Sequence, residues 1–108
     1  MPKYLIHGSY TAEGKRGLLK DGGSKRKGIV EGLIGGQGGS LESIYWAFGG
    51  TDLYAIVDMP DNTSMAAVAI AVAAGGAFEP KIAVLLTPEE IDAAVQKDVN
   101  YTPGITHS

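Results

Sequence analysis

The spacing of apolar and polar positions along the chain predicts an alternation of short strands and helices. Runs of β-favouring residues that end at glycine, proline or aspartate predict strands, and apolar residues that recur every three or four positions predict helices. The expected strands cover residues 3–10, 41–48, 52–59 and 78–86, and the expected helices cover residues 12–34, 62–74 and 88–97. The resulting order, β-α-β-β-α-β-α, is typical of an α+β domain in which a four-stranded antiparallel sheet carries helices on one face.

Glycines and capping residues divide these elements. Two adjacent glycines, Gly22 and Gly23, cost about 1 kcal/mol each against alanine inside a helix, so we expect a kink or break within residues 21–24. On either side of this break, the helix at 12–34 is expected to present a single apolar stripe. The side chains expected to cap the helices at their N-termini are Thr11, Asp61 or Asn62, and Thr87.

Alternation along the strands makes both faces of the expected sheet apolar. One side of the first strand carries Leu5, His7 and Ser9, and the other side carries Tyr4, Ile6 and Tyr10. The second strand separates Tyr45 from Trp46 and Phe48, and the third separates Tyr54 and Ile56 from Leu53, Ala55 and Val57. A single layer of helices would leave one apolar face exposed, and two sheets closing face to face in a homodimer would cover it.

The helix at 62–74 points to the same conclusion. Its apolar residues lie on all sides rather than on one stripe, and such a helix is usually buried on more than one side. We therefore expect a homodimer or a higher oligomer whose contacts include Tyr45, Ile70 and their neighbours.

Composition narrows the class of protein. The chain has 108 residues, 44% apolar and 19% charged, with a net charge of -3, so it offers no basic field for nucleic acid. It contains no cysteine, and its histidines and carboxylates show no metal-ligand spacing, so neither a metal nor another cofactor is expected. The longest apolar run, residues 65–74, is too short to cross a bilayer, and the first residues turn polar too soon for a signal peptide. We expect one cytoplasmic domain at 1–97 followed by an extended tail at 98–108.

Several motifs resemble those of one family. The turn Gly49-Gly50-Thr51-Asp52 leads through an apolar strand to Pro60-Asp61, and similar stretches lie at 10–14, 45–46 and 85–90. In these motifs the chain resembles the GYD domain family, which implies a ferredoxin-like α+β fold related to the dimeric α+β barrels. Thr51 stands where the family has its eponymous tyrosine, and the resemblance implies no particular activity.

The residues with candidate chemistry lie on the strands and the hairpin. His7, at the centre of a strand, can exchange a proton near neutral pH and is the candidate catalytic base, although such a histidine more often only hydrogen-bonds a neighbour. Tyr45, Trp46 and Tyr54 would suit an apolar ligand pocket or an ordinary dimer interface. Asp52 is a further candidate ligand contact, but a carboxylate beside a turn more often accepts bonds from backbone amides.

Two other patterns favour structural roles. The segment at 8–15 lies between a strand and a helix as a phosphate-binding loop does, but its glycine spacing is wrong, and a turn capped by Thr11 explains it better. The basic cluster at 25–27 is more typical of a solvated helix surface than of an anion site, although a break at Gly22 and Gly23 could form a small anion nest.

Three functions remain open from the sequence. The first is an oligomeric protein that binds a small apolar or aromatic molecule, or serves assembly, without catalysis. The second is a cofactor-independent enzyme of the dimeric-barrel kind, such as a monooxygenase or isomerase that uses His7 in an aromatic-lined cavity. The third is a regulatory subunit that docks another protein through the tail around Tyr101 and Pro103.

Overall fold

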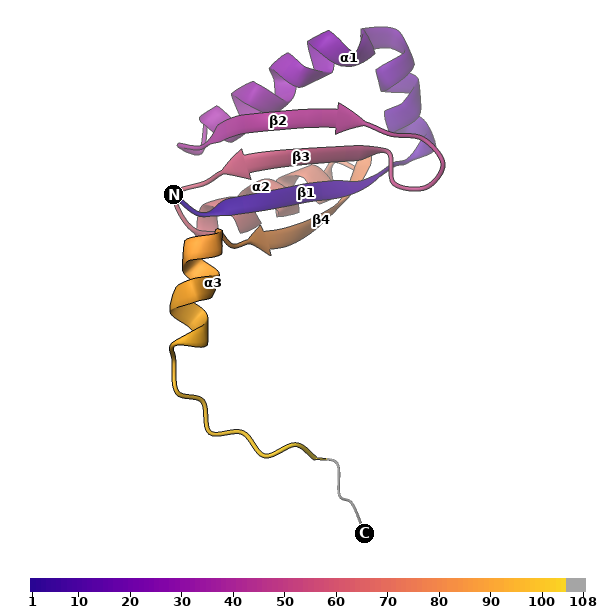
Figure 1. Ribbon diagram of the computed structural model, residues 1–108. Coiled ribbons are helices and arrows are strands. Elements are labelled where there is room, and N and C mark those ends of the chain that lie inside the picture. Colours follow the sequence, from indigo (N-terminus) through magenta and orange to yellow (C-terminus); the bar gives the residue numbers. More distant parts are fainter. Residues whose placement is uncertain (105–108) are drawn as a thin grey trace.

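The computed structural model describes residues 1–104 and has the predicted order of elements (Figure 1). The strands are β1 (Lys3–Tyr10), β2 (Ser40–Trp46), β3 (Leu53–Asp58) and β4 (Phe78–Leu85). The helices are α1 (Ala12–Gly35), α2 (Asn62–Ala74) and α3 (Pro88–Val95). This order confirms the ferredoxin-like α+β fold with an added C-terminal helix. The last four residues of the tail expected at 98–108, His107 among them, lie outside the described residues.

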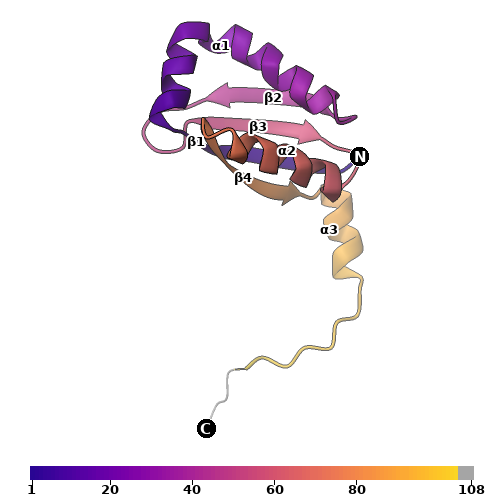
Figure 2. The same cartoon turned by 180° about the vertical axis from the view of Figure 1, so that it is seen from behind.

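The strands form one antiparallel sheet in the order β2-β3-β1-β4. Helix α2 lies behind this sheet in Figure 1 and in front of it in Figure 2, and α1 lies along β2 in both views. Both helices cover the same face, because Ile34 of α1 and Met65 of α2 pack in one buried cluster with Tyr4. The register confirms the predicted alternation, with Leu5, His7 and Ser9 on the face opposite the helices. We call this second face the open face. Its residues on the paired strands are Lys3, Leu5, His7, Ser9, Ser40, Ser43, Tyr45, Tyr54, Ile56, Asp58, Glu79, Lys81, Ala83 and Leu85.

Both edges of the sheet are irregular. The register of β2 on β3 shifts between Leu41 and Ser43, which marks a bulge in one edge strand. The other edge strand, β4, contains Pro80 between Glu79 and Lys81, and proline has no amide proton to offer a further strand.

The core lies between the sheet and the helices. Its largest fully buried side chains are those of Tyr4, Ile34, Val57 and Met59, from β1, α1, β3 and the residue after β3. The phenol of Tyr4 donates to the amide oxygen of Asn62, the first residue of α2, so the one polar atom of this side chain has a partner inside the fold.

Helix α1 bends at Gly22, as the paired glycines predict. Gly22 has φ 78° and ψ 176°, which is not a helical conformation, and Figure 1 shows the two halves of α1 at an angle. The expectation of one apolar stripe along the whole helix is wrong. Ile34 is fully buried, but Leu19 is 86% exposed, because the break rotates the first half relative to the second.

The connection between β2 and β3 is longer than predicted. Strand β2 ends at Trp46, and the following chain turns through Gly49, whose φ is 107°. Phe48 therefore does not share the helix-covered face with Trp46, and its side chain is 99% exposed. The backbone of Asp52 holds this loop, because its carbonyl accepts from the Ala47 amide at 2.9 Å and its amide donates to the Gly8 carbonyl at 2.9 Å.

Helix α3 projects away from the domain. Every residue from Pro88 to Val95 is exposed, and the helix leaves the sheet beside the end of β4 (Figure 1). Helix α3 and the extended chain that follows it make the radius of gyration 17.6 Å, against about 13 Å for a compact chain of 100 residues. The capping box of α3 is complete, since Thr87 Oγ1 accepts from the Glu90 amide at 3.1 Å and Glu90 Oε1 accepts from the Thr87 amide at 2.9 Å. The helix therefore forms by its own local signals without packing on its own sheet.

Acidification should weaken the N-terminus of α2. Asp61 Oδ1 accepts from the Ser64 amide at 2.8 Å, and this bond lowers the pKa of the Asp61 carboxyl below its ordinary value of 3.8. The stabilisation is therefore complete above pH 3.8 and is lost as the pH falls through the lower pKa of the folded state. We expect the natural protein to unfold at a higher temperature than Asp61→Asn at neutral pH, and this difference to shrink in acid. Thermal unfolding of both proteins along a pH series measures the effect, and a constant difference would contradict it.

Candidate functional site

A row of four side chains crosses the open face from one edge to the other. His7 pairs with Lys81 of β4 on one side and with Tyr54 of β3 on the other, and Tyr54 pairs with Tyr45 of β2. The rings of His7 and Tyr54 are nearly parallel, with an interplanar angle of 6° and centroids 6.2 Å apart. We call Lys81, His7, Tyr54 and Tyr45 the aromatic row. Antiparallel pairing thus brings an ammonium, an imidazole and two phenols onto one line.

The aromatic row borders an apolar strip. The next row towards the N-terminus of β1 contains Leu5 and Ile56, which pair directly with each other, and Ala83 on the far side of Leu5. These apolar side chains share the open face with the rings, and Tyr45 is 72% exposed. None of the helices in residues 1–104 covers this face.

A charged cluster closes one end of this strip. Lys3 Nζ lies 2.6 Å from Glu42 Oε1 and 3.0 Å from Asp58 Oδ1. The hydrogen bonds to Glu42 and then to Asp58 raise the pKa of the Lys3 ammonium above its ordinary value of 10.5. Because this lysine is satisfied by two carboxylates, the ammonium that remains for a ligand near the aromatic row is that of Lys81.

Trp46 and Asp52 lie apart from the aromatic row. Trp46 is on the helix-covered face, where its Nε1–H donates to the hydroxyl of Tyr10 at 3.1 Å. Asp52 Oδ2 accepts from the Tyr10 backbone amide at 3.0 Å. Both residues therefore hold the end of β1 against the hairpin, and they line a shallow open groove of about 400 Å³ with Leu19 and Phe48. Of the predicted site residues, the structure brings together His7, Tyr45 and Tyr54.

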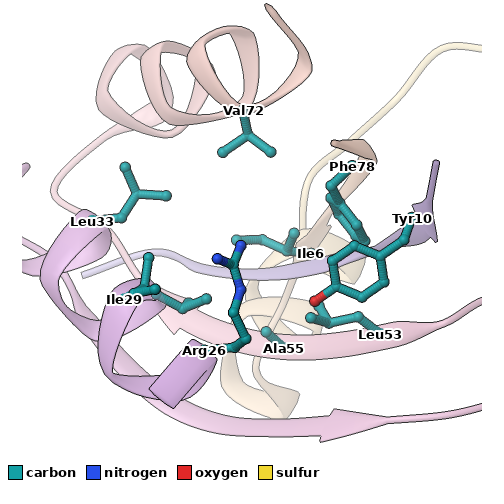
Figure 3. Close-up of a pocket in the computed structure, with 10 residues that line it drawn as sticks. Ile6, Tyr10, Arg26, Ile29, Leu33, Leu53, Ala55, Val72 and Phe78 are labelled. Atoms are coloured by element: carbon teal, nitrogen blue, oxygen red, sulfur yellow. The ribbon is translucent and has the colours of Figure 1, made fainter. Parts of the chain in front are cut away.

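A second site lies on the helix-covered face, and sequence reasoning missed it. A cavity of about 110 Å³ opens between α1, α2 and the middle of the sheet, with the guanidinium of Arg26 inside it (Figure 3). The signal was present in the sequence. Arg26, Ile29, Val30 and Leu33 follow the i, i+3, i+4, i+7 spacing of one helix stripe, so an arginine occupies a position where an apolar residue is expected.

The structure supports the structural interpretation of the loop before α1. Thr11 Oγ1 accepts from the Gly14 amide at 3.2 Å and donates to the Gly76 carbonyl at 2.8 Å, so this residue caps α1 and ties it to the chain after α2. In the basic cluster at 25–27, Lys25 and Arg26 both pair with Asp21, at 3.5 and 3.4 Å.

Neither a metal centre nor a membrane span is found in the part of the chain that the structure describes. Across residues 1–104, histidines and carboxylates do not gather into groups of three that could hold a metal ion. Within the same residues, the helices are too short or too polar to span a bilayer.

A comparison with models of known protein families shows which family this chain belongs to. The model of the GYD domain matches residues 4–95. The chain belongs to the GYD domain family. A search of curated proteins and a search of solved structures each found no match. The matched region ends at Val95, so the GYD domain includes α3, although this helix does not pack on its own sheet.

Proposed function

We propose that this GYD domain protein associates with itself through its open face and binds a small aromatic or apolar molecule between the paired sheets, without catalysing a reaction. The observation that carries the proposal is the aromatic row on a face that lacks a helix cover in residues 1–104. Such apolar surface is unusual on a monomer, and a second copy related by a twofold axis would cover it with the same surface.

The chemistry of the row favours a flat ligand with a polar edge. The rings of His7 and Tyr54 present stacked faces, and the phenols and the imidazole can donate or accept hydrogen bonds at their edges. Lys81 adds a positive charge beside His7. A pocket that combines apolar walls with a few polar groups is typical of small-molecule sites.

Helix α3 supports the same arrangement. Ile91 and Val95 lie one turn apart, and Val95 is 71% exposed. The ribbon of α3 is vivid in Figure 1 and faint in Figure 2, so the helix lies towards the side of the open face. In a pair of sheets packed face to face, α3 would extend towards the second copy and bury its apolar side there.

Tyr45 and Ile70 would belong to two different contacts. Tyr45 lies on the open face, whereas Ile70 is 70% exposed on α2, on the other side of the sheet. The proposed face-to-face pair uses Tyr45. A contact through Ile70 would join such pairs into a higher oligomer.

One feature of the row favours an enzyme as the second candidate. His7 lies between the ammonium of Lys81 and the phenol of Tyr54 in the register. An imidazole base beside a cation could remove a proton from a carbon acid, and the cation would stabilise the negative charge that forms. This arrangement would serve a cofactor-independent isomerase or monooxygenase.

Native mass spectrometry of the purified chain, followed by identification of the released small molecules, tests the proposal. We expect a dimer or a multiple of it that carries an aromatic or apolar compound. His7→Ala and Tyr54→Ala should lower the occupancy while the dimer persists, because both remove rings from the ligand site. Leu19→Ala is the matched control, since it removes an exposed apolar side chain elsewhere, and its occupancy should be unchanged.

Each other outcome has a distinct meaning. A monomer without a bound compound would overturn the proposal. A dimer whose interface is filled by side chains would exclude ligand binding there and leave self-assembly as the only remaining part of the proposal. If His7→Ala still binds the compound but no longer converts it into a product, the protein is an enzyme that uses His7.

A further inference from the structure

The two helices that cover the sheet leave a gap between them. Helix α1 packs mainly on β2, at one edge of the sheet, and α2 packs on β4, at the other edge. The middle of the sheet is therefore the floor of a cavity of about 110 Å³ (Figure 3). The floor is formed by Ile6, Leu53 and Ala55, and the walls include Ile29 and Leu33 of α1 and Val72 of α2.

Among residues 1–104, Arg26 is the charged residue that lines this cavity, and it follows the kink at Gly22. The kink begins a new helical segment, in which Arg26 is the first member of the stripe that faces the sheet. Figure 3 shows the guanidinium beside Ile6, on the side of the sheet that faces α2. The side chain of Arg26 is only partly exposed.

The guanidinium keeps most of its hydrogen-bonding capacity. Its one hydrogen-bond partner within residues 1–104 is Asp21 Oδ2, at 3.4 Å from Nη1. This carboxylate also pairs with Lys25. A guanidinium has five N–H donors in a planar fork that matches a carboxylate, so one long bond leaves a pair of donors for a ligand.

Tyr10 adds a second donor at the same end of the cavity. Its hydroxyl oxygen accepts from Trp46 Nε1–H, which leaves the hydroxyl proton free to donate. The ring is held edge-on against Phe78, with centroids 5.2 Å apart. Figure 3 shows the hydroxyl turned from this ring towards the side of the cavity that Arg26 occupies.

We propose that this cavity binds a small amphipathic carboxylate, with the carboxylate on Arg26 and Tyr10 and the apolar group between the helices. One water molecule needs about 10–15 Å³ of cavity volume. This cavity has about 110 Å³, so it has room for a phenyl ring or a chain of about six carbons. The apolar floor provides the affinity for the chain, and the fork of Arg26 selects the charged head. This site does not rest on the pairing of open faces, since it lies on the other side of the sheet.

Calorimetric titration of the full-length protein with phenylacetate and hexanoate tests the inference. Trp46 is the only tryptophan of the chain and is bonded to Tyr10, so its fluorescence gives a second readout. We expect both acids to bind. Phenylacetamide should bind at least about tenfold more weakly, because the hydrogen bonds to a charged group are lost. Acetate and inorganic phosphate, which lack the apolar group, should bind more weakly still.

Paired variants distinguish binding at Arg26 in the cavity from a general effect of the positive charge of the helix. Arg26→Gln should weaken the binding of phenylacetate by about tenfold to a hundredfold. Lys27→Gln removes the same charge from the next, exposed residue and should leave the affinity within about twofold. Ala55→Leu should fill the floor and block binding, and Val72→Leu serves the same purpose if circular dichroism shows that the first variant does not fold.

Three results would overturn the inference. These are no binding by either acid, equal affinities for phenylacetate and its amide, and equal losses in Arg26→Gln and Lys27→Gln. His7→Ala should bind phenylacetate normally, so this variant distinguishes a failure here from a failure of the proposed open-face site.

Discussion

Tyr45→Glu is expected to abolish the self-association proposed for the open face and to leave a monomer. The residue lies on the open face, and a carboxylate there would become buried without a partner when two faces pack together. We expect association to weaken by at least about a hundredfold. Because Tyr45 is largely exposed in the single chain, folding should be preserved. Size-exclusion chromatography with light scattering measures the mass, and circular dichroism checks the fold.

Phe48→Glu is the matched control for this prediction. It introduces the same charge in place of an exposed aromatic residue on the neighbouring loop, outside the sheet. The mass of this variant should equal that of the natural protein. If Tyr45→Glu remains associated, or if both variants become monomers, the open face is not the specific contact.

Gly14→Ala is expected to destabilise the fold, whereas Gly17→Ala should stabilise it. A Cβ on Gly14 would collide with the carbonyl oxygen of Ala77 and would lie 2.8 Å from Tyr10 Cδ1. The first turn of α1 is held against this carbonyl, which accepts from the Thr11 amide at 2.9 Å, so it cannot move away without breaking the bond. We expect a loss of about 2–3 kcal/mol in the free energy of unfolding.

Gly17 lies one turn further along the same helix. A Cβ there meets no atom within 4 Å, and alanine loses less backbone entropy than glycine when the helix forms. The expected gain is about 0.5–1 kcal/mol. Urea unfolding of both variants measures these values, and equal effects in the two would mean that the approach of α1 to residue 77 is not tight.

Local signals were enough to predict the fold. Paired glycines predicted a break within residues 21–24, and the helix breaks at Gly22. Thr11 and Thr87 cap their helices as expected, and of the two candidates Asp61 and Asn62 it is Asp61 that caps α2. Strand alternation separated His7 from Tyr4 and Ile6, and Tyr54 from Leu53 and Ala55, since this pattern depends only on the period of each strand. The register of β1 on β3 then places His7 and Tyr54 on the same side of the sheet. The length of the loop around Phe48 was not predicted, because the hairpin depends on tertiary bonds between Asp52 and Gly8.

The candidate sites could be predicted only in part. Alternation does not reveal which residue of another strand lies beside His7, so Lys81 entered the aromatic row only through the register of β4 on β1. The cavity at Arg26 depends on the separation of α1, which packs on β2, from α2, which packs on β4, and sequence spacing within one helix does not give this separation. The direction of α3 depends on the chain after β4, where the sequence specifies a helix but not its packing partner.

The irregular edges of the sheet bear on how far an assembly of this protein can grow. An unprotected edge strand can recruit another strand and extend a sheet without limit, which is the route to fibrils. Here one edge carries the bulge between Leu41 and Ser43, and the other carries Pro80 between two charged residues. Strand addition is disfavoured at both edges, so this sheet resists edge-to-edge growth into fibres.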